Sequence, residues 1–150
     1  MTGPADCIFC KIVRREAPAS VIREDTDTLA FMDISPTNPG HVLVIPKAHG
    51  AYLEDLPSGA SGPVLEAARE VAGALRRSGV RCEAVNLFLA DGREAGQEVF
   101  HVHLHVIPRY RGDGFGLVRV GPRSGETPSR ADLDRIAASI RAALPSLGGG

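Results

Sequence analysis

The segment that decides the fold is Phe100-His101-Val102-His103-Leu104-His105-Val106-Ile107-Pro108, in which three histidines alternate with apolar residues. This alternation predicts a β-strand over residues 99–108, because successive side chains of a strand point to opposite faces of a sheet. The three imidazoles would share one face, spaced about 6.6 Å apart, and the apolar side chains would fill the other. Only five histidines occur in the 150 residues of the chain, and three of them lie in this row.

A row of imidazoles predicts a functional site. Near neutral pH an imidazole acts as a nucleophile, a proton carrier, a metal ligand or a hydrogen-bond donor to phosphate. A single buried histidine is commonly a hydrogen-bonded core residue, but three at alternating positions would need three separate structural reasons. Two kinds of chemistry stay open: covalent catalysis at one ring, and a zinc site in which the His-x-His spacing supplies ligands and leaves a position for water.

The composition is that of an ordinary globular chain. Charged residues make up 23% and the net charge is −1, so no basic excess points to nucleic acid as a partner. No apolar stretch is long enough to span a bilayer and the first residues lack the pattern of a secretory leader, so we expect no membrane association. The three cysteines do not suggest a disulfide framework, and the cytoplasm is the expected compartment.

The pattern along the chain predicts one α+β domain over residues 1–150, with a mostly antiparallel sheet and two main helices. Its core would cover about 7–110, and residues 145–150 would fray. Apolar residues at helical spacing place the main helices at 63–77 and at about 129–144, where Ser129 begins a capping box. A short helical segment is expected at 8–15, and strands are expected at 19–23, 28–33, 41–46, 83–89 and 99–108.

Several segments, taken in order, resemble the histidine-triad (HIT) family of nucleotide-binding hydrolases and transferases. They are Ile8-Phe9-Cys10-Lys11-Ile12, Phe31-Met32-Asp33-Ile34-Ser35-Pro36, Gly40-His41-Val42-Leu43-Val44-Ile45-Pro46-Lys47-Ala48-His49, Ala95-Gly96-Gln97 and the histidine row. The resemblance runs from Cys7 to about Arg109. It implies a largely antiparallel sheet with helices, commonly paired as a two-fold homodimer.

The resemblance also implies a reaction, in which a nucleoside monophosphate, usually AMP, moves from a leaving group to water or another acceptor. His103 would be the nucleophile that attacks the α-phosphorus, His105 would hydrogen-bond the phosphate, and His101 would support them. The implied substrates are purine nucleoside phosphoramidates, adenylates or dinucleoside polyphosphates, with no organic cofactor. Two alternatives stay open: a zinc-dependent hydrolase that uses the histidine row as ligands, and a nucleotide-binding protein without catalysis.

The resemblance places a nucleotide beside further residues. Asp33 would accept hydrogen bonds from the ribose hydroxyls, although an aspartate in this position is also typical of a turn. The base would lie against Ile8, Phe9 and Ile34, which core packing explains equally well, and the phosphate against Gly96, Gln97 and Val99. The sequence departs from the family at Ala90, where relatives often carry an amide, and at Glu98, where they often carry serine or threonine.

A second candidate site begins with Cys7 and Cys10, spaced as C-x2-C. Pairs at this spacing bind zinc or act as redox pairs, but no thioredoxin-like βαβ pattern follows this one. With His49 and one imidazole of the row, the cysteines could supply the four ligands of a structural zinc ion. The resemblance to bacterial relatives implies that the fourth ligand is His101. Zinc would then tie the N-terminal segment to the histidine strand.

Overall fold

The computed structural model describes residues 3–116 and 128–145 of the chain. They divide into two compact units, one that ends at Gly114 and one that begins at Phe115 and contains the C-terminal helix. Residues 146–150 of the predicted frayed tail lie outside the described residues.

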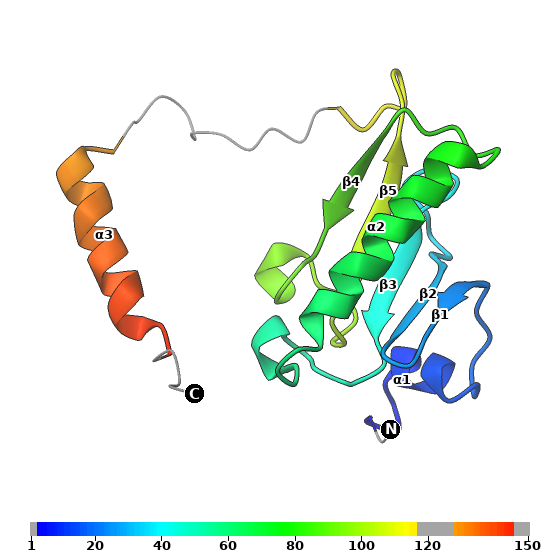
Figure 1. Cartoon of the computed structure of the whole chain (residues 1–150), viewed down its shortest axis with the longest axis horizontal. Coiled ribbons are helices and arrows are strands. Elements are labelled where there is room, and N and C mark those ends of the chain that lie inside the picture. The colour runs from blue at the N-terminus through cyan, green and yellow to red at the C-terminus, as the bar shows by residue number, and fades with distance from the viewer. Residues whose placement is uncertain (1–2, 117–127, 146–150) are drawn as a thin grey trace. The chain divides into compact units, whose positions relative to one another are not determined.

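Five strands form one sheet in the order β1-β2-β3-β5-β4, and every neighbouring pair is antiparallel. The strands are β1 Val21–Glu24, β2 Thr28–Met32, β3 Val42–Pro46, β4 Ala84–Phe88 and β5 Leu104–Arg109 (Figure 1). Two substantial helices, α2 Ser61–Arg77 and α3 Arg130–Ala143, accompany the short α1 Ile8–Val13. The α+β class with a mostly antiparallel sheet and two main helices is therefore confirmed. None of the described helices combines the length and apolar character needed to cross a membrane.

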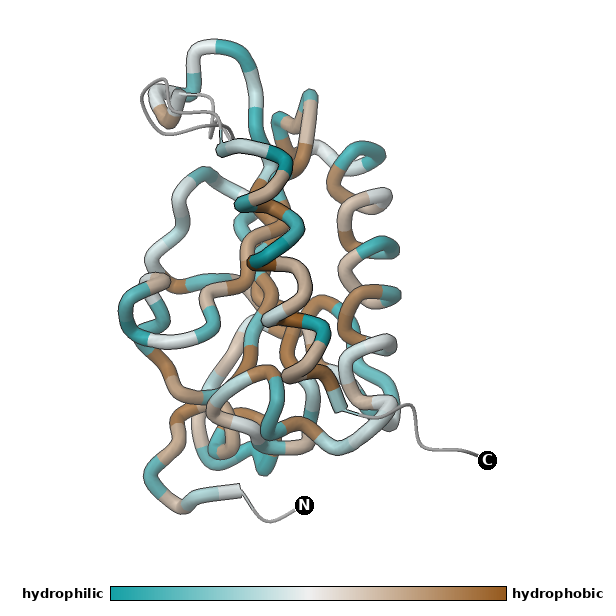
Figure 2. The backbone as a smooth tube through the Cα atoms, turned by 90° about the vertical axis from the view of Figure 1, so that its left-hand side faces the viewer, coloured by the Kyte–Doolittle hydropathy of each residue, from teal (hydrophilic) through white to brown (hydrophobic). Residues whose placement is uncertain are grey.

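The sheet is covered on both faces at β3. Helix α2 lies across one face, over β3 and β5 (Figure 1), and the buried cluster on that side includes Val44, Val64, Ala68, Val71 and Val106. On the other face, Leu43 and Ile45 of β3 pack in a second cluster with Phe9 and Ile12 of α1. Figure 2 shows that brown and teal alternate along the tube of the long helices, as expected of helices with one apolar face. A continuous apolar run predicts a strand that is buried on both faces, and β3 is one.

The histidine strand is shorter than the alternation predicts. Strand β5 begins at Leu104, so His101 and His103 lie in the segment before it, and the prediction of three histidines on one strand was wrong in this respect. The β3–β5 pairing ends where Val44 lies opposite Leu104, and Pro46, two residues further along β3, has no N–H to donate to a ladder. The N–H of Val102 bonds the carbonyl of Gly50 instead, at 2.8 Å.

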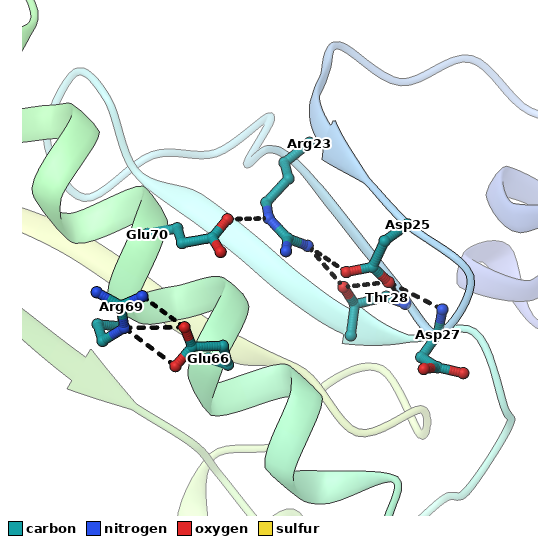
Figure 3. Close-up of polar contacts among 7 residues, drawn as sticks. All are labelled: Arg23, Asp25, Asp27, Thr28, Glu66, Arg69 and Glu70. Carbon is teal, nitrogen blue, oxygen red and sulfur yellow. Dashed lines mark hydrogen bonds and ion pairs between the residues drawn. The ribbon is translucent and has the colours of Figure 1, made fainter.

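A polar network ties the β1–β2 hairpin to α2. The guanidinium of Arg23 donates to Glu70 of α2, to Asp25 and to the hydroxyl of Thr28 (Figure 3). The other carboxylate oxygen of Asp25 accepts from the backbone N–H groups of Asp27 and Thr28, at 2.8 and 2.7 Å. The network therefore closes the hairpin turn and holds the outer strand of the sheet against the helix.

Helix α3 has the predicted start. The Oγ of Ser129 accepts from the backbone N–H of Asp132 at 3.1 Å and donates to its carboxylate at 2.7 Å, so the capping pattern is real. Its apolar face is between 40% and 64% exposed and consists of Leu133, Ile136, Ile140 and Leu144. The two remaining helical turns, both 3-10, are η1 Leu53–Asp55 and η2 Arg93–Ala95.

Candidate active site

The middle histidine of the row is held in one orientation by the backbone. The Nδ1–H of His103 donates to the carbonyl oxygen of His101 at 2.7 Å, since a carbonyl can only accept. The neutral ring therefore carries its lone pair on Nε2, and within the described parts of the chain no group bonds that atom. The ring of Phe9 packs edge-on against His103, with centroids 5.2 Å apart. His103 thus combines a fixed ring with a nitrogen free to attack.

His105, the third histidine of the row, is hydrogen-bonded to His41, for which the sequence predicts no role in the site. The backbone N–H of Thr37 donates to Nδ1 of His41 at 3.0 Å, so the proton of the neutral His41 ring lies on Nε2. That Nε2 lies 2.9 Å from Nδ1 of His105, which must then be the acceptor. The remaining nitrogen of His105, Nε2, consequently carries a proton that it can donate to a phosphate.

Burial keeps both of these rings neutral near pH 7. Burial first, and then the neighbouring His103 and His41, lower the pKa of His105 to about 4 against the opposing effect of Asp33. Burial also lowers the pKa of His41, again against Asp33. A neutral imidazole has one donor and one acceptor nitrogen, so the chain of tautomers from Thr37 to His105 holds at neutral pH.

Asp33 lies at the edge of this group and also forms a turn. Its Oδ1 accepts from the backbone N–H of Ser35 at 2.8 Å, as in an Asx turn. Its Oδ2 lies 3.5 Å from Nε2 of His41 and 4.0 Å from Nδ1 of His105. The turn and the site are therefore compatible, because the turn orients the carboxylate beside the two rings.

The predicted base-contact residues differ in exposure. Phe9 is buried against the two histidines of the row that precede the strand, with ring centroids 5.8 Å from His101. Ile8 is 44% exposed and Ile34, next to Asp33, is 97% exposed. The exposed isoleucine that follows Asp33 in the chain has apolar surface that a flat apolar ligand can cover.

The loop before the histidines is fixed by a buried glutamine. The side-chain NH₂ of Gln97 donates to the carbonyls of Ala51 and Val99 at 2.7 and 3.1 Å, and its carbonyl accepts from the N–H of Gly92 at 2.7 Å. Its side-chain amide is thus used within the protein, and the side chain serves to shape the loop. Gly96 has a φ of 95°, which a side chain would strain.

The two departures from the family pattern lie on either side of this loop. Ala90 is buried, and Glu98 is exposed to solvent. An exposed carboxylate can keep its hydration, so Glu98 carries no desolvation cost in this position.

Four predicted metal ligands converge. One donor atom from each of Cys7, Cys10, His49 and His101 lies within 4.8 Å of all the others. The Nδ1 of His101 is 3.6 and 3.5 Å from the two sulfur atoms, the Nδ1 of His49 is 3.3 Å from Sγ of Cys10, and the two nitrogens are 3.2 Å apart. Tetrahedral zinc with ordinary bond lengths requires about 3.6 Å between sulfur and nitrogen and about 3.3 Å between nitrogens. The donor set fits zinc.

The protonation of the cluster also favours a cation. The Nε2–H of His101 donates to the carbonyl of Pro46 at 2.8 Å, which leaves the lone pair of Nδ1 directed into the cluster. Burial and the adjacent Cys7 raise the pKa of Cys10 to about 11. Burial disfavours a thiolate because it removes water, and a thiolate on Cys7 would repel a second one on Cys10. A bound dication supplies the compensating charge, so metal binding and thiol deprotonation would occur together.

The histidine row does not form a single metal site. Of the two clusters of possible metal ligands in the described residues, one contains only His101 of the row and the other only His105, with Asp33 and His41. His103 belongs to neither cluster. The three rings thus have three different environments, which a site built from adjacent His-x-His ligands would not produce.

Comparison with known proteins agrees with this architecture. The sequence model of the HIT domain matches residues 14–112. The chain is 38% identical to the adenosine 5'-monophosphoramidase of Saccharomyces cerevisiae, over 99% of this chain and 87% of that protein. The crystal structure of a HIT family protein from Bacillus subtilis superposes with a TM-score of 0.82 at 39% identity, covering 94% of this chain and 99% of that one. A zinc-bound histidine triad family protein from Mycobacterium smegmatis gives a TM-score of 0.72 at 36% identity, over 95% and 100% of the two chains.

A five-stranded antiparallel sheet with this constellation of histidines defines an α+β protein of the HIT fold. The chain belongs to the histidine-triad family, as its sequence segments predict.

Proposed function

We propose that the protein hydrolyses or transfers nucleoside monophosphates, in particular AMP, through a covalent bond between Nε2 of His103 and the α-phosphorus. The observation that carries the proposal is the 2.7 Å hydrogen bond from Nδ1–H of His103 to the carbonyl of His101. It selects the tautomer whose Nε2 lone pair is free to attack. The name of the yeast relative, an adenosine 5'-monophosphoramidase, supports a substrate with a phosphorus–nitrogen bond.

The reaction proceeds by two displacements. In the first, the lone pair of Nε2 of His103 forms a bond to phosphorus while the bond to the leaving group breaks, and the leaving group keeps that electron pair. An amine leaving group takes a proton from solvent water, while Nε2–H of His105 keeps its proton and hydrogen-bonds the phosphoryl oxygens. In the second, water attacks phosphorus and releases a proton to solvent, while the bond to His103 breaks and its electron pair returns to Nε2. Two displacements retain the configuration at phosphorus.

The transition state gains negative charge on the phosphoryl oxygens, and neutral donors face it. With its lowered pKa, His105 offers its Nε2–H and no positive charge near pH 7, and His41 holds it in this tautomer by donating to Nδ1. Fixed donors stabilise such charge without reorganisation during the reaction. The backbone of Gly96, Gln97 and Val99 is the proposed further contact of the phosphate.

The nucleoside would extend away from the row. We place the ribose hydroxyls at Asp33, whose Oδ2 faces the histidines, and the purine between Phe9, Ile8 and Ile34. The exposure of Ile34, 97%, supports this placement, because the side chain has apolar surface left to bury.

Two further features complete the proposal. The Cys7–Cys10–His49–His101 cluster, referred to below as the metal cluster, would hold a structural zinc ion. The protein would form a homodimer, for which the sheet offers the edge strand β4 with Leu87 and Phe88, 46% and 48% exposed. Sedimentation of wild type and of Phe88→Asp tests the dimer, and a shift to monomer only in the variant supports this interface.

The test of the reaction is rapid-quench mass spectrometry during turnover of adenosine phosphoramidate, with a dinucleoside polyphosphate in parallel. An AMP adduct on His103 is expected. His103→Ala should lose the adduct and reduce kcat on the order of 10³-fold or more while still binding AMP. Normal turnover by this variant, or an adduct on another side chain, would refute the covalent route.

The same samples separate the two alternatives. If chelation of metal from folded protein abolishes turnover while the His103→Ala variant stays active, the zinc hydrolase is favoured. If AMP binds and no phosphoramidate, adenylate or dinucleotide is turned over, the protein is a nucleotide-binding protein without catalysis.

A further inference from the structure

One residue, His101, belongs both to the metal cluster and to the environment of the nucleophile. Its Nδ1 lies among the four cluster atoms, and its carbonyl oxygen accepts the Nδ1–H of His103. We infer that metal binding at the cluster positions the nucleophile, so that the metal acts on the reaction through His101 without contact with the substrate. This inference rests on the proposed role of His103 as nucleophile.

The segment that carries His101 and His103 precedes β5 and so lies outside the β3–β5 ladder. Among the described residues, two hydrogen bonds link its start to the chain around the end of β3. The Nε2–H of His101 donates to the carbonyl of Pro46 at 2.8 Å, and the N–H of Val102 donates to the carbonyl of Gly50 at 2.8 Å. The first is made by a ring of the metal cluster and the second reaches the residue after His49. Both connections therefore run through groups that a metal ion would fix.

Without a cation the centre of the cluster is poorly satisfied. The Nδ1 of His101 presents a lone pair, because the other nitrogen of the ring donates to Pro46. It faces Nδ1 of His49 at 3.2 Å and the two sulfur atoms at 3.5 and 3.6 Å. Thiols are weak donors, so this fully buried ring is held more weakly on its Nδ1 side than by the bond from Nε2–H to Pro46. A metal ion replaces these contacts with four directional bonds and fixes the ring.

Helix α1 gives a second connection to His103. Phe9 lies between the two cysteines in sequence, and its ring packs edge-on against His103 and His101 at 5.2 and 5.8 Å. The helix has only six residues, far fewer than a helix needs to be stable by itself. Fixing Cys7 and Cys10 therefore fixes the position of Phe9 against the nucleophile.

The first experiment observes the nucleophile without requiring turnover. The protein is labelled with ¹⁵N-histidine and studied as zinc-loaded, metal-depleted and zinc-reloaded wild type. In the loaded protein, His103 should show the Nδ1–H tautomer alone, with a slowly exchanging proton. In the depleted protein, tautomers should mix and the proton should exchange at least tenfold faster, and reloading should reverse both changes.

The second experiment measures kinetics with matched variants. Cys7→Ser removes a cluster ligand, and Cys82→Ser removes the cysteine that lies outside the cluster. For Cys7→Ser we expect kcat and the rate of adduct formation to fall about 10- to 100-fold, since a misplaced reacting group costs this much, with KM changed less than threefold. Cys82→Ser should match wild type in kinetics and in zinc content. Cys7→Asp keeps a ligand oxygen and should give an intermediate kcat.

The outcomes discriminate clearly. A folded, metal-depleted protein that keeps the single His103 tautomer and the wild-type rate of adduct formation overturns the inference. Removal of the metal or the Cys7→Ser substitution could unfold the chain, and in that case Cys7→Asp, which retains a metal ligand, is the deciding variant. An unchanged kcat of Cys7→Asp overturns the inference. A reduced kcat at constant KM supports it. If no adduct forms on His103 even in loaded protein, the proposed function fails, whereas the tautomer measurement still tests the coupling by itself.

Discussion

His41 donates its Nε2–H to Nδ1 of His105 across 2.9 Å, and it can do so because its own Nδ1 accepts from the backbone of Thr37. The backbone N–H of Thr37 therefore determines, through His41, which nitrogen of the His105 ring carries the proton. The consequence is chemical: His105 faces the proposed phosphate site with a donor nitrogen and not with a lone pair. His41 is a positioning residue in this arrangement.

His41→Leu should lower kcat about 10- to 100-fold, because His105 can then adopt the tautomer that repels phosphoryl oxygens. KM should change little if binding depends mainly on other contacts. His41→Gln offers an amide donor near the same place and should recover part of the loss. Steady-state kinetics of the three proteins check this, and equal kcat for the Leu variant and wild type would contradict it.

Asp33 is expected to recognise the ribose. Asp33→Asn should weaken binding of AMP about tenfold, since a hydrogen bond to a charged group is worth about 1.5–3 kcal/mol. The same variant should bind 2',3'-dideoxy-AMP no worse than wild type does, because that ligand lacks the hydroxyls. Calorimetric titration of both ligands into both proteins gives the interaction energy between the side chain of residue 33 and the ribose hydroxyls. Equal losses for the two ligands would mean that Asp33 acts only through its turn with Ser35.

Much of the architecture follows from patterns in the sequence, because apolar periodicity responds directly to burial. The run Val42–Ile45 predicts a doubly covered strand and becomes β3, and Ser129 caps its helix as the spacing predicts. Cysteine spacing and family resemblance together predict four candidate metal ligands, and the donor atoms of these residues converge.

Other features depend on tertiary contacts that no local pattern encodes. The sequence predicts His41 as the first residue of a strand at 41–46, and it is the packing of β3 beside β5 that brings His41 to His105. A histidine directly after a glycine-containing loop, at the start of a buried strand, is the signal that could have found it. Strand β5 starts at Leu104, where its pairing with Val44 of β3 ends, and the alternation within residues 99–108 carries no information about that distant partner.

The network of Arg23 should contribute more to stability than an isolated surface pair does. Arg23→Met removes bonds to Glu70, Asp25 and Thr28 and should lower the free energy of unfolding by about 1 kcal/mol (Figure 3). Arg69→Met removes a single exposed pair with Glu66 on the same helix and should lower the stability less than Arg23→Met does.

Urea denaturation of both variants measures the difference between the network and the single pair. Arg23 also holds the pKa of Asp25 well below its usual range, so this pKa should rise in Arg23→Met. Equal losses of stability in the two variants would show that the network adds nothing to its pairs.

The lowered pKa of His105 predicts a specific pH dependence of stability. In the folded protein this ring takes up a proton only near pH 4, whereas in the unfolded chain it does so near its usual value of about 6.5. Between these values the unfolded state binds more protons, so stability falls as the pH is lowered from 6.5 to 4. His105→Gln should lose this component. Unfolding of both proteins across this range isolates it, because metal loss in acid affects both alike.

Gly3 leaves room for the metal cluster. A Cβ at this position would lie 2.0 Å from Sγ of Cys10, within the cluster, and 3.2 Å from Cβ of His49. Gly3→Ala must therefore displace the N-terminal segment or the thiol, and zinc affinity should fall about 10- to 100-fold, as for other residues that position ligands.

Gly62→Ala is the matched control, because a Cβ on Gly62 in α2 meets nothing within 4 Å. That control should keep wild-type affinity and gain about 0.5–1 kcal/mol of helix stability. Competition with a zinc-binding dye measures both, and unchanged affinity in Gly3→Ala would show that the segment before Cys7 adapts without moving the ligands.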